Sequence, residues 1–178
     1  MAVDVLVLIG SLRKASLNRQ LAEVAADNAP DGATLTVFDR LGELPLYNED
    51  LDNHPVAEPV SALRSAAAAA DALLVVTPEY NGSIPGALKN ALDWLSRPYG
   101  ASALAGKPLA VIGTSLGRYG GLWSHDESRK SFGIAGARVV DDVKLSVPSR
   151  VFDGKHPREN AEVVADVGAA LGKLIAAV

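Results

Sequence analysis

A polar loop with the residue types needed to bind an anion follows the first apolar segment of the chain. The loop covers residues 10–18 (GSLRKASLN), between an apolar run at 3–9 and an amphipathic segment at 17–28. Free N–H groups and the dipole at a helix N-terminus attract anions, and a guanidinium can bind a phosphate through two parallel hydrogen bonds. The side chains that could donate are those of Ser11, Arg13, Ser16 and Asn18. The loop predicts an anion site, with a polar turn capped by Ser16 as the alternative.

Two further loops follow apolar, strand-like segments. Residues 78–85 come after the run at 72–77, and the glycine-containing residues 114–121 come after the run at 109–113. In a parallel sheet, ligands bind outside the carboxyl ends of the strands. We therefore expect the loops at 10–16, 78–85 and 114–121 to meet at one ligand site.

Strand and helix patterns alternate along the chain. The expected strands are 3–9, 35–38, 72–77, 109–113 and 137–140. The expected helices are 17–28, 61–70, a segment from Pro85 to Leu95, 122–133 and a C-terminal helix carrying Val164, Val167, Leu171, Leu174 and Val178. Prolines mark 39–60 and 146–158 as loops. This alternation predicts an α/β fold in which helices cover both faces of a parallel sheet, in one domain over residues 1–178.

Composition excludes several classes of protein. The chain has no cysteine, which rules out disulfides, thiolate catalysis and cysteine-ligated metals. Its three histidines, His54, His125 and His156, lack metal-ligand spacing, so no metal site is expected. The net charge of −4 argues against nucleic-acid binding. The run at 3–9 is too short to span a membrane and does not look like a secretory signal, so a cytoplasmic protein is expected.

Two segments together resemble the NAD(P)H-dependent FMN reductase family of flavodoxin-like proteins. They are GSLRKASLN at 10–18 and PEYNGSIPGALKNALDWLSRP at 78–98, and the resemblance extends over residues 3–140. It implies a flavodoxin-like three-layer sandwich with a five-stranded parallel sheet in the order 2-1-3-4-5. It also implies non-covalent FMN, NADPH or NADH as co-substrate, and a homodimer or homotetramer.

The resemblance also implies the binding residues. The first loop would hold the FMN phosphate, the second would line the isoalloxazine and ribityl groups, and the third would approach the flavin. The residues concerned are Ser11, Arg13, Ser16, Leu17, Asn18, Pro78, Glu79, Tyr80, Asn81, Ser83, Ser115 and Gly117. No residue is assigned as a catalytic acid or base, because the reactive centre is N5 of FMN.

The implied reaction is a two-electron hydride transfer from the nicotinamide to FMN N5 and on to an acceptor. Quinones, azo compounds, metal oxyanions and free flavins all remain open as acceptors. One shared site for both substrates predicts ping-pong kinetics. The choice between NADPH and NADH also stays open, with Lys14, Arg97 and Arg118 as candidates for binding a 2′-phosphate.

Two other functions are weighed against the reductase. Residues 113–117 match G-x-S-x-G, so Ser115 with Asp141 or Asp142 and His156 could form a hydrolase triad. That motif needs a helix directly after the serine, whereas Leu-Gly-Arg-Tyr-Gly-Gly follows. The second alternative is a non-catalytic electron carrier or flavin-binding regulator.

Overall fold

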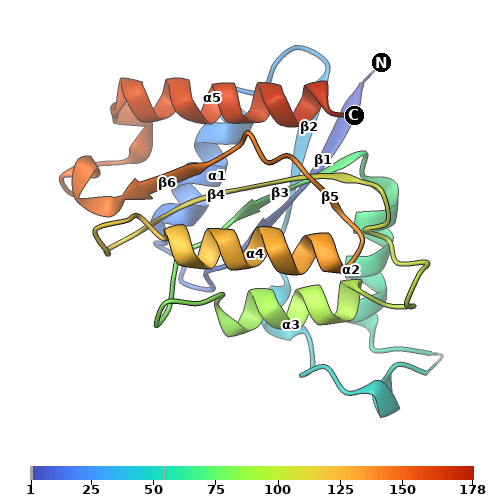
Figure 1. The fold of residues 1–178 in the computed structure, drawn as a ribbon. Coiled ribbons are helices and arrows are strands. Elements are labelled where there is room, and N and C mark those ends of the chain that lie inside the picture. Colours follow the sequence, from blue (N-terminus) through green and yellow to red (C-terminus); the bar gives the residue numbers. More distant parts are fainter. Residues whose placement is uncertain (1, 54) are drawn as a thin grey trace.

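The centre of the molecule is a parallel β-sheet with a helical layer on each face (Figure 1). The computed structural model describes residues 2–53 and 55–178, so His54, one of the histidines weighed above as a metal ligand, lies outside the described residues. The main strands are β1 (Val3–Ile9), β2 (Ala33–Phe38), β3 (Ala72–Val76) and β4 (Pro108–Ser115), followed by β5 (Arg138–Val139) and β6 (Leu145–Pro148). The order β2-β1-β3-β4-β5 confirms the predicted flavodoxin-like topology.

The edge beyond β4 differs from the prediction. β5 has only two residues and pairs with Pro108 and Leu109 at the start of β4, whereas β6 pairs with β4 from Ile112 to Ser115. The expectation that 146–158 is only a loop is therefore wrong at its start. A proline at the end of an edge strand is compatible with a sheet because no partner needs its missing N–H. β6 extends the sheet at the carboxyl end of β4, where the third predicted site loop begins.

Helices cover both faces of the sheet. α1 (Leu17–Asp27) and α5 (Ala161–Ala176) pack on one face, and α2 (Glu58–Ala69), α3 (Gly86–Leu95) and α4 (Leu122–Ile134) pack on the other (Figure 1). Along β1, Leu6 and Leu8 contribute to one apolar core and Val5, Val7 and Ile9 to the other. A strand segment buried on both faces must be apolar, which is why β1 from Val5 onwards and the whole of β3 are uninterrupted apolar runs.

Short 3-10 helices lie between the main elements, and α2 begins earlier than predicted. The 3-10 turns are η1 (Leu41–Glu43), η2 (Glu49–Leu51), η3 (Ser149–Phe152) and η4 (Pro157–Glu159). The expected start of the second helix at residue 61 is wrong, because α2 begins at Glu58 and includes Pro59 in its first turn. A proline is tolerated there because the first-turn N–H groups have no intrahelical partner. No helix within the described ranges has both the length and the apolar character needed to cross a membrane.

Candidate functional site

The loop after β1 presents polar atoms at the N-terminus of α1. Gly10 is required at its start, because a Cβ there would lie 2.2 Å from Oγ1 of Thr77. Ser16 caps the helix, with its Oγ accepting a hydrogen bond from the N–H of Asn18 at 3.2 Å. Arg13 is exposed on the loop, and no described carboxylate forms an ion pair with it. This end of α1 therefore combines a free guanidinium with the positive end of a helix dipole.

The side chain of Asn18 joins the first loop to the third. Its Nδ2 donates to the carbonyl of Thr114 at 2.9 Å, and its Oδ1 accepts from the N–H of the same residue at 2.9 Å. Asn18 is buried, and this pair of bonds satisfies the backbone of β4 at Thr114, beyond the point where the pairing with β3 ends. The predicted phosphate ligand is thus also a structural link between α1 and β4.

The second loop contains a tight turn between Tyr80 and Ser83. Tyr80 and Ser83 exchange two backbone hydrogen bonds of 3.1 Å, and Asn81 and Gly82 between them have φ of 53° and 74°. Asn-Gly is the favoured pair for a turn with two positive φ values. The hydroxyl of Tyr80 lies 3.4 Å from Oγ of Ser11, so this loop reaches the first one.

The carboxylate of Glu79 caps α4 from outside that helix. Gly121, at the N-cap position, has no side chain and a φ of 101°. Oε2 of Glu79 accepts hydrogen bonds from the N–H groups of Trp123 at 3.1 Å and Ser124 at 3.3 Å. A carboxylate at a helix N-terminus is favoured by the unpaired N–H groups and by the dipole. The side chain of Glu79 therefore attaches the second loop to α4.

His125 lies fully buried behind the second loop. Its Nε2 is 2.8 Å from the carbonyl of Thr77, and its Nδ1 is 2.6 Å from Oγ of Ser146 on β6. A carbonyl only accepts, so Nε2 carries the proton and Nδ1 accepts from the serine hydroxyl. Burial lowers the pKa of His125 to about 4, with the positive charge of Arg129 adding to the effect. The imidazole is thus neutral at physiological pH.

The three loops line one cavity of about 570 Å³ at the carboxyl end of the sheet. The predicted residues that line it are Ser11, Arg13, Ser16, Leu17, Asn18, Pro78, Glu79, Tyr80, Ser115 and Gly117. Asn81 and Ser83 do not line it: Asn81 is in the tight turn, and Oγ of Ser83 donates to Glu127 at 2.7 Å.

Three lining residues were missed from the sequence: Thr114, Leu116 and Ser149. Thr114 and Leu116 flank the predicted Ser115, so their place next to a strand end was a usable signal. Ser149 follows β6 and had no local signal, because that strand was not predicted. Oγ1 of Thr114 is buried and has no hydrogen-bond partner among the described residues. A buried hydroxyl without a partner costs free energy in the folded protein.

The hydrolase triad is not assembled. Oγ of Ser115 lies 3.4 Å from the carbonyl of Glu79, and no described histidine bonds to it. His156 instead contacts Oε2 of Glu23 at 3.2 Å, and His125 bonds to Thr77 and Ser146. A serine nucleophile needs a base within hydrogen-bond reach, so the G-x-S-x-G match does not form a nucleophile site here; its Ser115 and Gly117 line the cavity instead.

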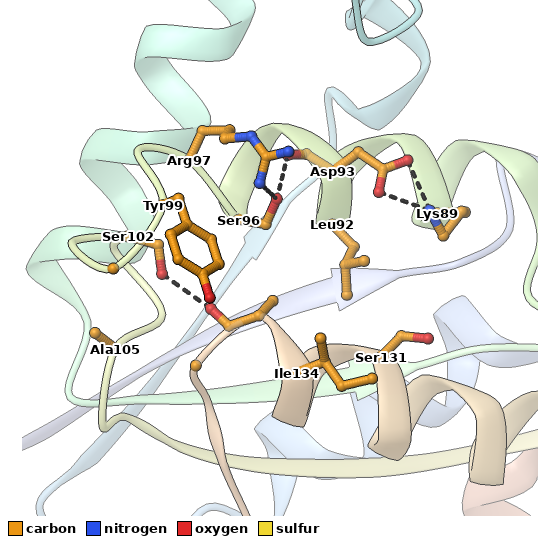
Figure 2. Close-up of a pocket in the computed structure, with 13 residues that line it drawn as sticks. Lys89, Leu92, Asp93, Ser96, Arg97, Tyr99, Ser102, Ala105, Ser131 and Ile134 are labelled. Carbon is orange, nitrogen blue, oxygen red and sulfur yellow. Dashed lines mark hydrogen bonds and ion pairs between the residues drawn. The ribbon is translucent and has the colours of Figure 1, made fainter. Parts of the chain in front are cut away.

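A second hollow, of about 490 Å³, lies between the C-terminal ends of α3 and α4 (Figure 2). Arg97 lines it and donates to the hydroxyl of Tyr47 at 3.1 Å. The second loop lies at the opposite end of α3, and that helix of ten residues is about 15 Å long. Arg97 is therefore remote from the main cavity, whereas Lys14 and Arg118, the other two candidates for a 2′-phosphate, lie on the first and third loops.

Comparisons with known proteins point to one family. Residues 3–151 match the family model described as NADPH-dependent FMN reductase. A 2-hydroxy-1,4-benzoquinone reductase from a Burkholderia species is 51% identical over 120 residues, covering 67% of this chain and 64% of that protein. The aligned part is therefore less than two thirds of that relative. A quinone reductase of Escherichia coli K12 is 40% identical over 163 residues, covering 91% of this chain and 85% of that protein.

A solved structure has the same fold over nearly the whole chain. It is that of FerB, a flavoenzyme NAD(P)H:(acceptor) oxidoreductase from Paracoccus denitrificans, with a TM-score of 0.84 and 32% identity. The alignment covers 98% of both chains.

Proposed function

This chain belongs to the NADPH-dependent FMN reductase family, and we propose that it transfers two electrons from NAD(P)H through FMN to a quinone. Membership in this family implies FMN as cofactor and NAD(P)H as co-substrate. The balanced reaction converts a quinone, NAD(P)H and one proton into a hydroquinone and NAD(P)⁺. The names of the two relatives support a quinone over an azo compound, a metal oxyanion or free flavin.

The residues around the cavity fit FMN. The cavity has a volume of about 570 Å³, which lies in the range found for cofactor sites. The N-terminus of α1 with Arg13 offers charge and N–H donors for a phosphate. The side chains of Ser11, Ser16 and Ser115 offer further polar groups around the cavity.

Within this cavity each loop has its own task. Arg13, Ser11 and Ser16 bind the phosphate at the N-terminus of α1. Pro78, Glu79 and Tyr80 form the wall along the isoalloxazine and the ribityl chain. The remaining lining residues complete the pocket: Leu17, Asn18, Ser115 and Gly117. FMN, when bound, supplies the N5 atom that exchanges electrons with both substrates.

The observation that carries this proposal is the convergence of the loops after β1, β3 and β4 on one cavity. At the N-terminus of α1 this cavity has the guanidinium of Arg13, which pairs with no carboxylate of the described residues. A parallel sheet places exactly such loops side by side at its carboxyl edge. The same convergence would suit an electron carrier, so reduction by NAD(P)H has to be measured.

We further propose a homodimer or homotetramer. Exposed apolar side chains gather near the cavity: Leu116, Tyr119 and Trp123 are 92%, 51% and 58% exposed. Rings of Tyr119 and Trp123 lie 5.9 Å apart. Exposed apolar clusters mark interaction surfaces. Light scattering after size-exclusion chromatography measures the mass, and a monomer would contradict the proposal.

A cytoplasmic location stays a prediction from the sequence.

The first test is a visible absorption spectrum of the protein reconstituted with FMN, before and after anaerobic NADPH or NADH. The proposal expects a bound-flavin spectrum that bleaches with at least one of them and recovers when a quinone is added. Bound flavin that does not bleach would favour the carrier or regulator. Failure to bind FMN would refute the proposed site.

Steady-state kinetics test whether both substrates use one site. We expect parallel double-reciprocal plots when NAD(P)H and quinone are varied, because the oxidised nicotinamide leaves before the quinone enters. Intersecting lines would contradict a shared site.

A further inference from the structure

Three consecutive carbonyl groups, at the end of β3 and the start of the second loop, accept hydrogen bonds from side chains. The carbonyl of Thr77 accepts from Nε2 of His125 at 2.8 Å. The carbonyl of Pro78 accepts from Oγ of Ser124 at 2.9 Å, and that of Glu79 accepts from Oγ of Ser115 at 3.4 Å. Two of these donors are neighbours in the first turn of α4. The loop that lines the cavity is therefore oriented from behind by α4.

The contact to Thr77 is the most constrained of the three. Thr77 is fully buried at the end of β3 between two glycines, and a Cβ on Gly113 would lie 2.0 Å from its carbonyl oxygen. His125 is also fully buried, and Ser146 of β6 fixes its tautomer through Nδ1. The carbonyl of Thr77 therefore accepts from a fully buried imidazole, and the orientation of that imidazole is fixed by Ser146.

These contacts determine which way the loop amides face. In a planar trans peptide the C=O and the following N–H point in opposite directions. The carbonyl of Pro78 points to Ser124, so the N–H of Glu79 points away from α4. Pro78 and Glu79 both line the cavity. If this peptide turned over, the carbonyl oxygen of Pro78 would face away from α4 in place of the N–H of Glu79. That side of the loop would then offer an acceptor where it now offers a donor.

We infer that His125 and Ser124 are positioning residues for FMN: they hold the carbonyls of Thr77 and Pro78 against α4 so that the second loop presents its amide edge to the flavin. Neither side chain lines the cavity. Their effect on the flavin passes through the backbone of residues 77–79. This inference rests on the proposed function, because it concerns the same cavity.

The test compares three variants of α4 in the full-length protein. His125→Leu removes both hydrogen bonds of the imidazole. His125→Gln keeps an N–H donor at a similar distance from the backbone. Ser128→Ala is the matched control, because Ser128 is equally buried on the same helix and its Oγ has no partner among the described residues. FMN affinity is measured by fluorescence quenching below the melting temperature of each apoprotein, together with the absorption spectrum and midpoint potential of the bound flavin.

We expect His125→Leu to weaken FMN binding by about tenfold or more, the size of one lost hydrogen bond, because the unsupported loop can then turn its amide edge away from the flavin. The variant should also shift the spectrum or potential of the flavin. His125→Gln should restore most of the affinity, and Ser128→Ala should bind as the wild type does. If His125→Leu lowers only the melting temperature while FMN affinity, spectrum and potential stay unchanged, the inference is wrong. If the wild type itself does not bind FMN, the proposed function fails instead.

Discussion

Acid should destabilise the folded protein through His125. Burial lowers the pKa of this imidazole to about 4 in the folded state, against 6.5 for an unperturbed histidine. Between these two pH values the unfolded chain binds a proton that the folded protein does not bind. The free energy of unfolding therefore rises with pH across this window. The stability that the neutral imidazole contributes is lost as the pH falls from 6.5 towards 4. Well above 6.5 the imidazole is neutral in both states, so it contributes no pH dependence there.

The shift gives the size of the effect. One pKa unit corresponds to 1.36 kcal/mol, so lowering the pH from 7 to 5 should cost about 2 kcal/mol through this residue alone. Going on to pH 4 should raise the loss to about 3 kcal/mol. The loss is a large share of a typical stability of about 5–15 kcal/mol.

Other groups titrate in the same range, so the measurement has to isolate the imidazole. Urea unfolding of the apoprotein from pH 5 to pH 7.5 is compared between the wild type and His125→Gln, whose side chain has no charge to gain. The free energy of the wild type minus that of the variant should fall by about 2 kcal/mol from pH 7 to pH 5. A difference independent of pH would show that His125 titrates alike in both states, and would refute the buried neutral imidazole between Thr77 and Ser146.

Three substitutions test the cavity and the sheet edge that supports it. Arg13→Ala should weaken FMN binding by about 1.5–3 kcal/mol, because it removes a charge-assisted contact; titration with unchanged affinity would exclude a phosphate role. Thr114→Val should keep or raise the melting temperature of the apoprotein, because it removes a buried hydroxyl that has no partner among the described residues; a clear fall in that melting temperature would contradict this. Gly113→Ala should prevent stable folding, because its Cβ would lie 2.0 Å from the carbonyl oxygen of Thr77; a melting temperature equal to the wild type would show that the strand ends can separate.

The main elements and the place of the site were predictable because they depend on local pattern. Apolar runs such as 3–9 and 72–77 are typical of strands buried on both faces, and their alternation with amphipathic segments indicates a parallel sheet. The topology of such a sheet brings the loops after β1, β3 and β4 together. Most of the predicted binding residues accordingly line one cavity.

Local pattern failed where a strand depends on its neighbour. Residues 145–148 form β6 because they pair with the end of β4. The sequence predicts a loop from residue 146 onwards, because of its prolines and glycine. Ser149 reaches the cavity only as a consequence of that pairing.

The sequence alone determined the strands from β1 to β4, the covering helices and the three loops that follow β1, β3 and β4, because side-chain periodicity and strand-end position are local properties. Only the tertiary structure decided what the polar side chains do. The amide of Asn18 forms two hydrogen bonds with the backbone of Thr114, and the carboxylate of Glu79 caps α4. The neutral imidazole of His125 donates to the carbonyl of Thr77. Each of these roles is set by a partner more than 40 residues away in the chain. Such pairings follow from packing, and no spacing within one segment can reveal them.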